Sequence, residues 1–365
     1  MAGTRTDRLA PIDWTRGLVM ILMAVDHASQ FLNKGRIFPG SRNLTNGVTS
    51  FPVDQFFLRW ATHICPVAFV FLAGVSIVLS VNRKRAKGAS DGEIDRFLAS
   101  RGIVIALFDF IWLNAYQGWK HFDLDVLTAI GSGLVAMTLV RRLGRPLATV
   151  AAFALLLTPE LGDVGLPRAL ENALWDGGPA GTMLLFRYPI LPWVGIMAMG
   201  YAWGDLVLGP EATTARIGRY ARNTLLPMFG VFVVVRGLNT IGNARAPRLD
   251  GSLQQWLNVS KNPPSLAFLG LELAILGGML VLFSRAAERG ATLKPLTVFG
   301  QTALFFYVIH FYVIAIVAGV TGNMGKHGIA GAIVGALLLV VAMYPLCRWY
   351  AGYKSGKDNW LTRYV

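Results

Sequence analysis

The chain has 365 residues, of which 54% are hydrophobic and 15% are charged, and its formal net charge at pH 7 is +14. A soluble domain carries nearer a quarter charged residues, so this composition excludes an ordinary soluble enzyme and indicates a membrane protein. The excess of Lys and Arg does not indicate nucleic-acid binding, because these residues lie in short loops between apolar segments and not on one polar face.

Apolar segments long enough to cross a bilayer recur along the whole chain. A membrane-spanning helix needs about 20 mostly apolar residues, and no long polar region separates the segments that meet this condition. We therefore predict a single all-α membrane domain over residues 1–365, a polytopic bundle of about ten transmembrane helices. The predicted spans are 14–33, 56–81, 99–118, 122–140, 146–161, 188–207, 222–241, 265–284, 296–319 and 328–347.

The distribution of Lys and Arg over the connecting loops predicts the orientation of the bundle. Twenty of these residues fall in loops on one side and ten in loops on the other side. Loops rich in Lys and Arg stay in the cytoplasm, so both termini are predicted to be cytoplasmic. The outer loops 34–55, 162–187 and 242–264 are long and rich in Gly, Pro, Asn and Ser, and we expect them to form short surface or re-entrant segments.

The first predicted span carries Arg16 and His27. Eleven residues of helix place their side chains within roughly 20° of the same face and about 16 Å apart along the axis. Arg16 would then lie at the cytoplasmic mouth, where a guanidinium group can bind phosphate. The deeper imidazole of His27 can take a proton from an attacking amine or hydroxyl group.

Ionisable side chains at membrane depth are costly unless they are paired or face water. With the predicted orientation, eight such side chains lie toward the outer half of the bundle, and their grouping favours a shared water-filled site over unrelated structural hydrogen bonds. They are Asp26, His27, Arg59, His63, Asp125, Arg236, Glu272 and His310. Asp26 is turned about 100° from His27 on the helix, so it can pair with an arginine such as Arg59 or Arg236 in place of the imidazole.

These positions suggest roles for a reaction in which His27 accepts a proton. Asp26 and His63 are the candidate catalytic helpers of His27. Arg59 and Arg236 are candidates to stabilise a developing negative charge, with Glu272 and His310 as further charge partners. Packing is the expected role of Cys65, and no metal is expected because no two histidines lie on one helix at ligand spacing.

No glycine-rich phosphate motif or serine-nucleophile elbow occurs in the chain. A phosphate-bearing ligand would therefore be bound by basic loops and helix ends. The candidates are Arg16, Arg83, Lys84, Arg85 and Arg141, although charges at membrane edges commonly serve only to set the orientation of the chain.

Several segments resemble one family of membrane enzymes. Ile12-Asp13-Trp14-Thr15-Arg16-Gly17, followed by Asp26-His27, resembles the bacterial relatives of the heparan-α-glucosaminide N-acetyltransferase catalytic domain. The spacing of Arg16 and His27 also resembles the signature of the wider transmembrane acyltransferase superfamily. Further similar segments extend over essentially the whole chain: Arg59–Pro66, Phe69–Gly74, Leu191–Gly195, Lys261–Leu266, Phe305–His310 and Tyr344–Trp349.

The resemblance implies a multi-span enzyme that takes acetyl-CoA from the cytoplasm and acetylates an amine or hydroxyl of a sugar or glycan outside. His27 would carry the catalytic role, and Lys261 and Ser265 would lie in the loop on the acceptor side. In the heparan-acetylating animal branch the essential histidine lies farther along the outer loop, and no histidine occurs here between residues 28 and 62. Heparan itself is therefore not the expected acceptor.

Two other interpretations use the same residues differently. A proton-coupled membrane transporter would use the buried His, Asp and Arg side chains as a relay, and a non-catalytic membrane scaffold would tolerate the loss of His27. Because no lumenal domain or targeting extension is attached, we expect the bacterial cytoplasmic (inner) membrane as the location. The oligomeric state stays open, and a homodimer is compatible with the sequence.

Overall fold

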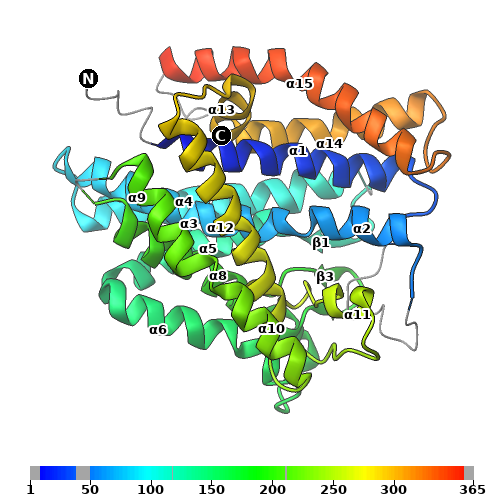
Figure 1. Cartoon of the computed structure of the whole chain (residues 1–365), viewed down its shortest axis with the longest axis horizontal. Helices are drawn as coiled ribbons and strands as arrows, with labels where there is room; N and C mark the ends of the chain where they lie inside the picture. Colours follow the sequence, from blue (N-terminus) through cyan, green and yellow to red (C-terminus); the bar gives the residue numbers. More distant parts are fainter. Residues whose placement is uncertain (1–8, 38–49, 117, 210–211, 357–365) are drawn as a thin grey trace.

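The computed structural model describes residues 9–37, 50–116, 118–209 and 212–356, and it is mostly helical (Figure 1). The helices are α1 (Ala10–Leu32), α2 (Val53–Thr62), α3 (Ile64–Arg85), α4 (Asp91–Leu107), α5 (Val126–Val140), α6 (Gly144–Leu156), α7 (Arg168–Glu171), α8 (Ile190–Val207), α9 (Thr214–Tyr220), α10 (Met228–Leu238), α11 (Leu253–Leu257), α12 (Leu266–Glu288), α13 (Lys294–Gln301), α14 (Ala303–Val320) and α15 (Ile329–Gly356). The strands are β1 (Phe122–Leu124), β2 (Gly178–Ala180) and β3 (Leu184–Phe186).

Within the described residues, seven helical stretches are long and apolar enough to cross a membrane. This confirms the predicted all-α membrane fold, whereas the number of ten spans and the cytoplasmic position of both termini stay predictions. The seven stretches are Val53–Arg85, Val126–Glu160, Ile190–Val207, Thr214–Leu238, Leu266–Glu288, Ala303–Val320 and Ile329–Lys354.

Several predicted spans differ from the helices that the structure contains, and two of them show why. The segment 122–140 was predicted as one helix, but its first three residues form strand β1 and the helix begins only at Val126. The segment 296–319 contains two helices, α13 and α14, because the backbone leaves the helical conformation at Thr302. Hydropathy averages over about 20 residues and therefore misses such local breaks.

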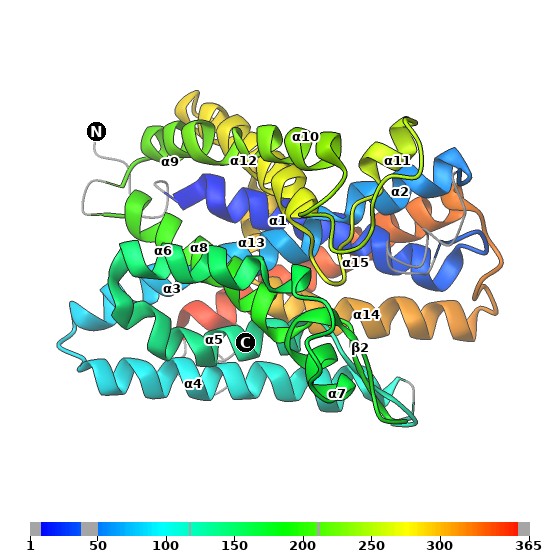
Figure 2. The same cartoon turned by 90° about the horizontal axis from the view of Figure 1, so that it is seen from below.

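Helix α1 lies in the interior of one half of the bundle, against α3, α12, α13, α14 and α15 (Figures 1 and 2). Two glycines allow α13 to approach α1 closely. A Cβ atom added to Gly17 would lie 2.1 Å from the carbonyl oxygen of Leu296, and one added to Gly300 would lie 2.0 Å from that of Asp13. The short helix α13 is thereby held against α1 at the level of Arg16.

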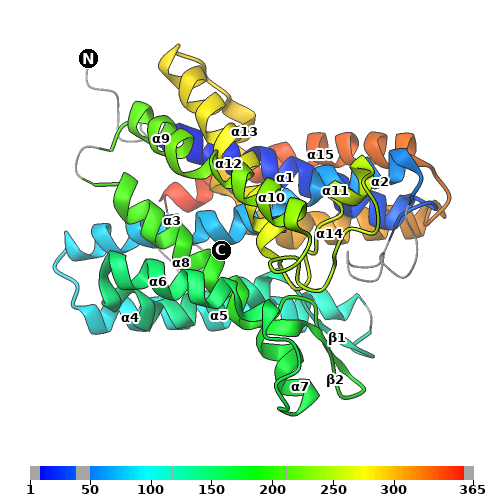
Figure 3. The same ribbon diagram turned by 60° about the horizontal axis from the view of Figure 1, so that its bottom comes forward.

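The other half of the bundle is built on α8, which packs against α3, α5 and α6, while α4 packs against α5 (Figure 3). Helix α4 begins with a capping box in which Ser90 and Glu93 each bind the backbone N–H of the other. Helices α9 and α10 pack along α12 on a further side. Helix α3 therefore links the α8 group to the group that surrounds α1.

The outer loops fold into short elements at one end of the bundle. Strand β3 lies between β1 and β2, parallel to β1 and antiparallel to β2. Helix α7 precedes β2 in the loop 162–187, and α11 lies within the loop 242–264. These two loops thus form the short segments expected from the sequence, whereas residues 38–49 of the loop 34–55 lie outside the described residues.

Candidate functional site

His27 of α1 and His310 of α14 are in direct contact. Nδ1 of His27 lies 2.8 Å from Nε2 of His310, and the two rings are stacked with their centroids 4.9 Å apart. The other nitrogen of His310, Nδ1, lies 2.8 Å from the carbonyl oxygen of Phe306, one helical turn earlier. The imidazole of His27 is thus held by a second imidazole, which is held by the backbone of α14.

These contacts fix the tautomers of a neutral histidine pair. A carbonyl oxygen only accepts hydrogen bonds, so Nδ1 of His310 carries the proton and Nε2 of His310 is an acceptor. Nδ1 of His27 must therefore donate, which leaves the lone pair on Nε2 of His27. That atom has no hydrogen-bond partner within the described chain. The arrangement is suited to a general base, because His310 orients the imidazole that receives the proton.

Asp26 does not bind His27. Its two carboxylate oxygens accept hydrogen bonds from Arg36 at 3.1 and 3.2 Å, and one of them accepts another from Thr62 at 2.9 Å. Arg36 also donates to the backbone carbonyl of Asp26. Arg36 follows a turn after α1, in which the side-chain oxygen of Asn33 accepts a hydrogen bond from the backbone N–H of Gly35. Asp26 therefore pairs with an arginine, but with Arg36 of the outer loop and not with Arg59 or Arg236.

His27 lines a cavity of about 440 Å³ on the side of the bundle where the outer loops lie. Four cations and three carboxylates line this outer cavity: Arg36, Arg59, Arg187, Lys261, Asp26, Asp123 and Asp125. Arg187 donates to Asp123 at 2.6 Å and lies 3.9 Å from Asp125. The structure thus brings together most of the polar side chains that were predicted to share a site.

Of two further residues in the predicted group, His63 lines this outer cavity and Glu272 does not. His63 lines it at the junction of α2 and α3, and its ring meets Phe268 of α12 edge to face. Nδ1 of His63 and both carboxylate oxygens of Glu272 are buried without a hydrogen-bond partner in the described residues. Buried polar atoms are usually satisfied, so these two side chains are candidates for holding a water molecule or a proton beside the site.

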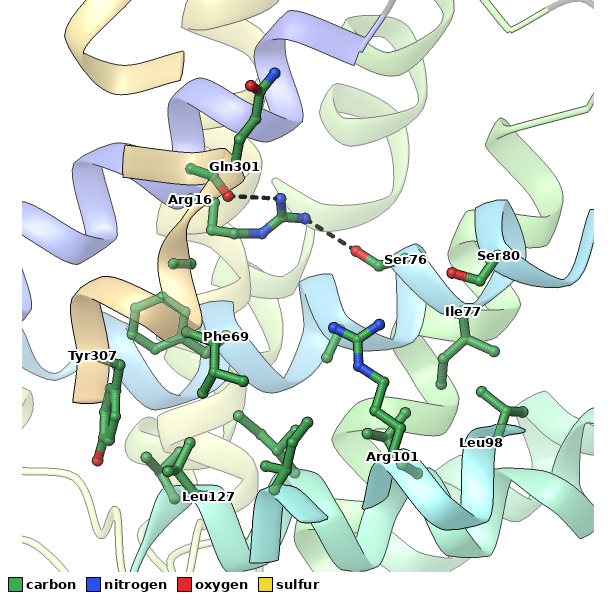
Figure 4. Close-up of a pocket in the computed structure, with 18 of the residues that line it drawn as sticks. Arg16, Phe69, Ser76, Ile77, Ser80, Leu98, Arg101, Leu127, Gln301 and Tyr307 are labelled. Carbon is green, nitrogen blue, oxygen red and sulfur yellow. Dashed lines mark hydrogen bonds between the residues drawn. The ribbon is translucent and has the colours of Figure 1, made fainter. Parts of the chain in front are cut away.

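Arg16 lines a second cavity of about 210 Å³, which extends along α3 from Phe69 to Ser80 (Figure 4). Its guanidinium group donates to Ser76 at 3.0 Å and to the carbonyl oxygen of Gly300 at 3.1 Å. It also pairs with Asp13 at 3.1 Å. Eleven residues of helix correspond to about 16 Å, so this inner cavity is long enough for an extended chain with an anionic end.

Two further cations, Arg101 of α4 and Lys354 of α15, line the inner cavity. Figure 4 shows Arg101 approaching from the wall opposite Arg16. No carboxylate in the described part of the chain lies within 4.0 Å of the Arg101 guanidinium, and its Nε atom is buried without a partner. Apart from a few polar groups the remaining walls are apolar, so bound phosphate would meet concentrated positive charge.

The two cavities adjoin each other. Phe69 of α3, Val126 of α5 and Tyr307 of α14 line both of them. Arg16 and His27 were predicted to share one face of a helix, and the structure places them in two cavities with this shared wall. A ligand that crosses the wall would reach from the cationic inner cavity to His27.

Arg236 lies away from both cavities. Its guanidinium group donates to the side chain of Asn243 at 2.7 Å and to the carbonyl oxygens of Ala246, Trp256, Asn258 and Gln255. These contacts hold the loop 242–264 against α10, because one buried cation satisfies several backbone carbonyls. The predicted role of Arg236 in stabilising a developing negative charge has no support in this geometry.

Four of the residues predicted to bind phosphate lie outside the cavities: Arg83, Lys84, Arg85 and Arg141. Arg141 pairs with Asp91 and Asp95, Arg85 pairs with Asp91, and Lys84 lies over the ring of Phe97. Arg83 is exposed at the end of α3. Of the residues predicted to bind phosphate, only Arg16 lines a cavity that could hold one.

Several cavity residues had not been identified from the sequence. Arg101 could have been found, because it is an isolated arginine within a predicted span. Arg36, Arg187 and Lys354 lie in loops or at a helix end, where no periodicity marks them. Tyr307 lies among many aromatic residues of α14 and carries no distinguishing signal.

The two residues predicted for the acceptor side have different environments. Lys261 lines the outer cavity, with its ammonium group 5.9 Å from the centre of the Tyr188 ring. Burial lowers the pKa of Lys261 from its usual value, although the carboxylate of Asp26 opposes this change. Ser265 instead caps α12 by accepting from the N–H of Phe268 at 3.0 Å, and it lines neither cavity.

The described residues contain no cluster of three or more His, Cys, Asp or Glu side chains suited to a metal ion. Cys65 is buried beside the outer cavity, and its sulfur contacts the carbonyl oxygen of Val19 at 3.6 Å.

Comparison with known proteins gives one match. The family model for heparan-α-glucosaminide N-acetyltransferase, catalytic, matches residues 8–233, which is more than half of the chain. A search of curated proteins found no match. The matched region includes Arg16 and His27, whereas Tyr307 and His310 lie beyond it.

Proposed function

The chain belongs to the heparan-α-glucosaminide N-acetyltransferase catalytic family, and we propose that it moves an acetyl group from cytoplasmic acetyl-CoA to an amine or hydroxyl of a sugar or glycan on the outer side of the membrane. Membership in the family implies a membrane acetyltransferase. The donor, the acceptor class and the sidedness are our proposal. The observation that carries it is the His27–His310 pair, of which His27 lines a polar cavity that adjoins a cationic one.

The inner cavity is the proposed site for the donor. The phosphates of acetyl-CoA would bind near Arg16, Arg101 and Lys354, because guanidinium and ammonium groups bind phosphate through charge-assisted hydrogen bonds. The mostly apolar walls between Ser80 and Phe69 would surround the pantetheine arm. The acetyl group would then lie near the wall that the two cavities share, within reach of the outer cavity.

The outer cavity is the proposed site for the acceptor and for the proton transfer. Nε2 of His27 takes the proton from the acceptor amine or hydroxyl as the nitrogen or oxygen attacks the thioester carbonyl carbon. The tetrahedral intermediate then breaks its carbon–sulfur bond, and the proton on His27 passes to the CoA sulfur. The products are the acetylated acceptor and CoA thiol. His310 holds the imidazole during both proton transfers, and we propose a direct transfer without an acetylated histidine.

We place the enzyme in the bacterial cytoplasmic membrane, in accordance with its apolar helices and the family. Asp26 and Arg36 would keep the outer wall of the site in position through their ion pair. Arg59 and Lys261 would contact the acceptor, and His63 and Glu272 would hold water beside it. Membrane lipid surrounds the bundle, and a homodimer remains compatible with its exposed apolar helices.

The test is turnover of acetyl-CoA by the purified protein in lipid nanodiscs, with an amino sugar as acceptor. The variant His27→Ala should lose between about 10²- and 10⁴-fold in kcat, because the general base is gone, while acetyl-CoA should still bind. His121→Ala is the matched control, since His121 is exposed in an outer loop, and it should retain wild-type turnover. Absence of acetyl-CoA binding and turnover in the wild-type protein would exclude the proposed function.

A further inference from the structure

Tyr307 occupies the junction of the two cavities. It lines the inner cavity that contains Arg16 and also the outer cavity that contains His27. Among the described residues, two apolar ones, Phe69 and Val126, share this position with it. The Tyr307 ring meets the His27 ring edge to face, with the centroids 6.2 Å apart. Figure 4 shows Tyr307 and Phe69 at one end of the inner cavity and Ser80 at the other.

The Tyr307 hydroxyl is available for a ligand. It makes no hydrogen bond with any residue that the structure describes, although the side chain is only 8% exposed. On the next helical turn, by contrast, Tyr312 donates its hydroxyl hydrogen to the carbonyl oxygen of Trp112. A tyrosine hydroxyl in a low-dielectric environment normally has a hydrogen-bond partner. A ligand bound at the junction could supply the missing acceptor for the Tyr307 hydroxyl.

The reaction proposed above requires a hydrogen-bond donor at this point. If phosphate binds near Arg16 and the acceptor is deprotonated by His27, the thioester carbonyl must lie between the two groups. Negative charge develops on the carbonyl oxygen as the tetrahedral intermediate forms. Arg236 is bound to the loop 242–264, and Phe69 and Val126 have no polar side-chain atom. Among the residues shared by both cavities, Tyr307 is therefore the one that can donate.

We propose that Tyr307 is a catalytic residue whose hydroxyl donates a hydrogen bond to the thioester carbonyl oxygen and to the oxyanion that replaces it. The phenol keeps its proton throughout, so it adds no proton-transfer step to the reaction. Phe69 and Val126 close the junction around the acetyl methyl group. This inference rests on the proposed function, since it assumes that a thioester reaches the junction.

The first experiment compares the kinetics of Tyr307→Phe with those of the wild type. This change keeps the ring and its contact with His27 and removes only the donor. Loss of one oxyanion donor should lower kcat by about 10²- to 10³-fold, while the dissociation constant of acetyl-CoA stays within about twofold. Tyr344→Phe on α15 is the control, because Tyr344 lines neither cavity, and it should retain wild-type kinetics.

The second experiment observes the carbonyl group directly. Infrared difference spectra of bound acetyl-CoA labelled with ¹³C at the carbonyl should show a band at lower wavenumber than in solution, and Tyr307→Phe should remove that shift. A bound band at the solution position in the wild-type protein would overturn the inference even if Tyr307→Phe did not fold. Wild-type kcat in Tyr307→Phe would also overturn it, and the proposed function would stand as long as the wild-type protein turns over acetyl-CoA.

Discussion

The inner and outer cavities adjoin each other but differ in their chemistry. The inner cavity is lined by three cations, Arg16, Arg101 and Lys354, on otherwise mostly apolar walls, and none of the described residues that line it is a carboxylate. The outer cavity mixes four cations with three carboxylates and contains His27. A lining that carries several cations favours binding of an anion, whereas a mixture of charges around an imidazole favours proton transfer. The division supports the proposed separation of donor binding, in the inner cavity, from chemistry, in the outer cavity.

This separation predicts different kinetic effects for mutations in the two cavities. Changes at the cations of the inner cavity should alter KM for acetyl-CoA and leave kcat nearly unchanged, because they remove binding that is equal in the ground state and the transition state. Changes near His27 should lower kcat and leave the affinity for acetyl-CoA unchanged. The predictions below test this difference.

The largest effect after the loss of His27 itself is expected for His310→Ala. The His27 imidazole would lose the partner that fixes its tautomer, and kcat should fall by about 10²- to 10⁴-fold. His310→Gln should recover part of the loss, because the amide oxygen can accept from Nδ1 of His27. Steady-state kinetics and acetyl-CoA binding measure both effects. An equal loss of affinity for acetyl-CoA in His310→Ala would contradict the separation of the cavities.

Arg101→Gln should act on the other cavity. Removing one charge-assisted hydrogen bond to phosphate should raise the dissociation constant of acetyl-CoA by about 10- to 100-fold, with kcat within about twofold of wild type. Isothermal titration with acetyl-CoA measures the change. Arg83→Gln is the informative control, since Arg83 was also predicted to bind phosphate but lies outside the inner cavity. A larger effect of Arg83→Gln than of Arg101→Gln would reverse this assignment.

Lys261→Met should have a smaller and different effect. The ammonium group faces the outer cavity and can donate hydrogen bonds to acceptor oxygens, so its loss should raise KM for the acceptor by about 5- to 20-fold. KM for acetyl-CoA should not change. Burial lowers the pKa of Lys261. As the pH rises, Lys261 should therefore lose its charge, and acceptor binding should weaken, at a lower pH than an exposed lysine would require. Lys326→Met is the control, because Lys326 is an exposed lysine in an outer loop. Equal KM values for the acceptor in the two variants would exclude a contact between Lys261 and the acceptor.

The sequence predicted the helical bundle because hydropathy over about 20 residues is a strong signal. The predicted span 265–284, for example, corresponds to α12 over Leu266–Glu288. The strand at Phe122–Leu124 and the break at Thr302 were not predicted, because each depends on a few residues and on contacts made elsewhere. Strand β1 pairs with β3 from a loop about 60 residues later in the chain, and no local pattern in the sequence reports such pairing.

The part of the site that could be predicted consists of ionisable residues within apolar segments, because such residues stand out in the sequence. His27, His63, His310 and Asp26 were found in this way, and the structure places all four in or beside the outer cavity. The same rule misassigned the environment of Arg236, because the loop carbonyls that bind it belong to a fold that composition does not specify. Residues that reach the site from loops, such as Arg36, could not be predicted, because only the tertiary structure places them there.

The smallest effect on activity is expected for Arg141→Met, although its effect on stability should be clear. Arg141 binds Asp91 and Asp95 at the end of the bundle where α4 begins, and its side chain is only 1% exposed. Hydrogen bonds from Arg141 and then from Arg85 lower the pKa of Asp91 to about 2. The stabilisation from this group is therefore complete above its usual pKa near 3.8 and is lost as the pH falls toward 2.

In Arg141→Met, we expect kcat and the affinity for acetyl-CoA to stay within about twofold of wild type and Tm at pH 7 to fall by several degrees. The difference in Tm between variant and wild type should shrink as the pH falls through the range from 3.8 to 2, because protonation of Asp91 removes the same ion pair in the wild type. Thermal unfolding in nanodiscs at pH 7, 4 and 3 measures this. A strong loss of acetyl-CoA binding with unchanged Tm would instead place Arg141 with the donor and extend the inner cavity to the α3–α4 loop.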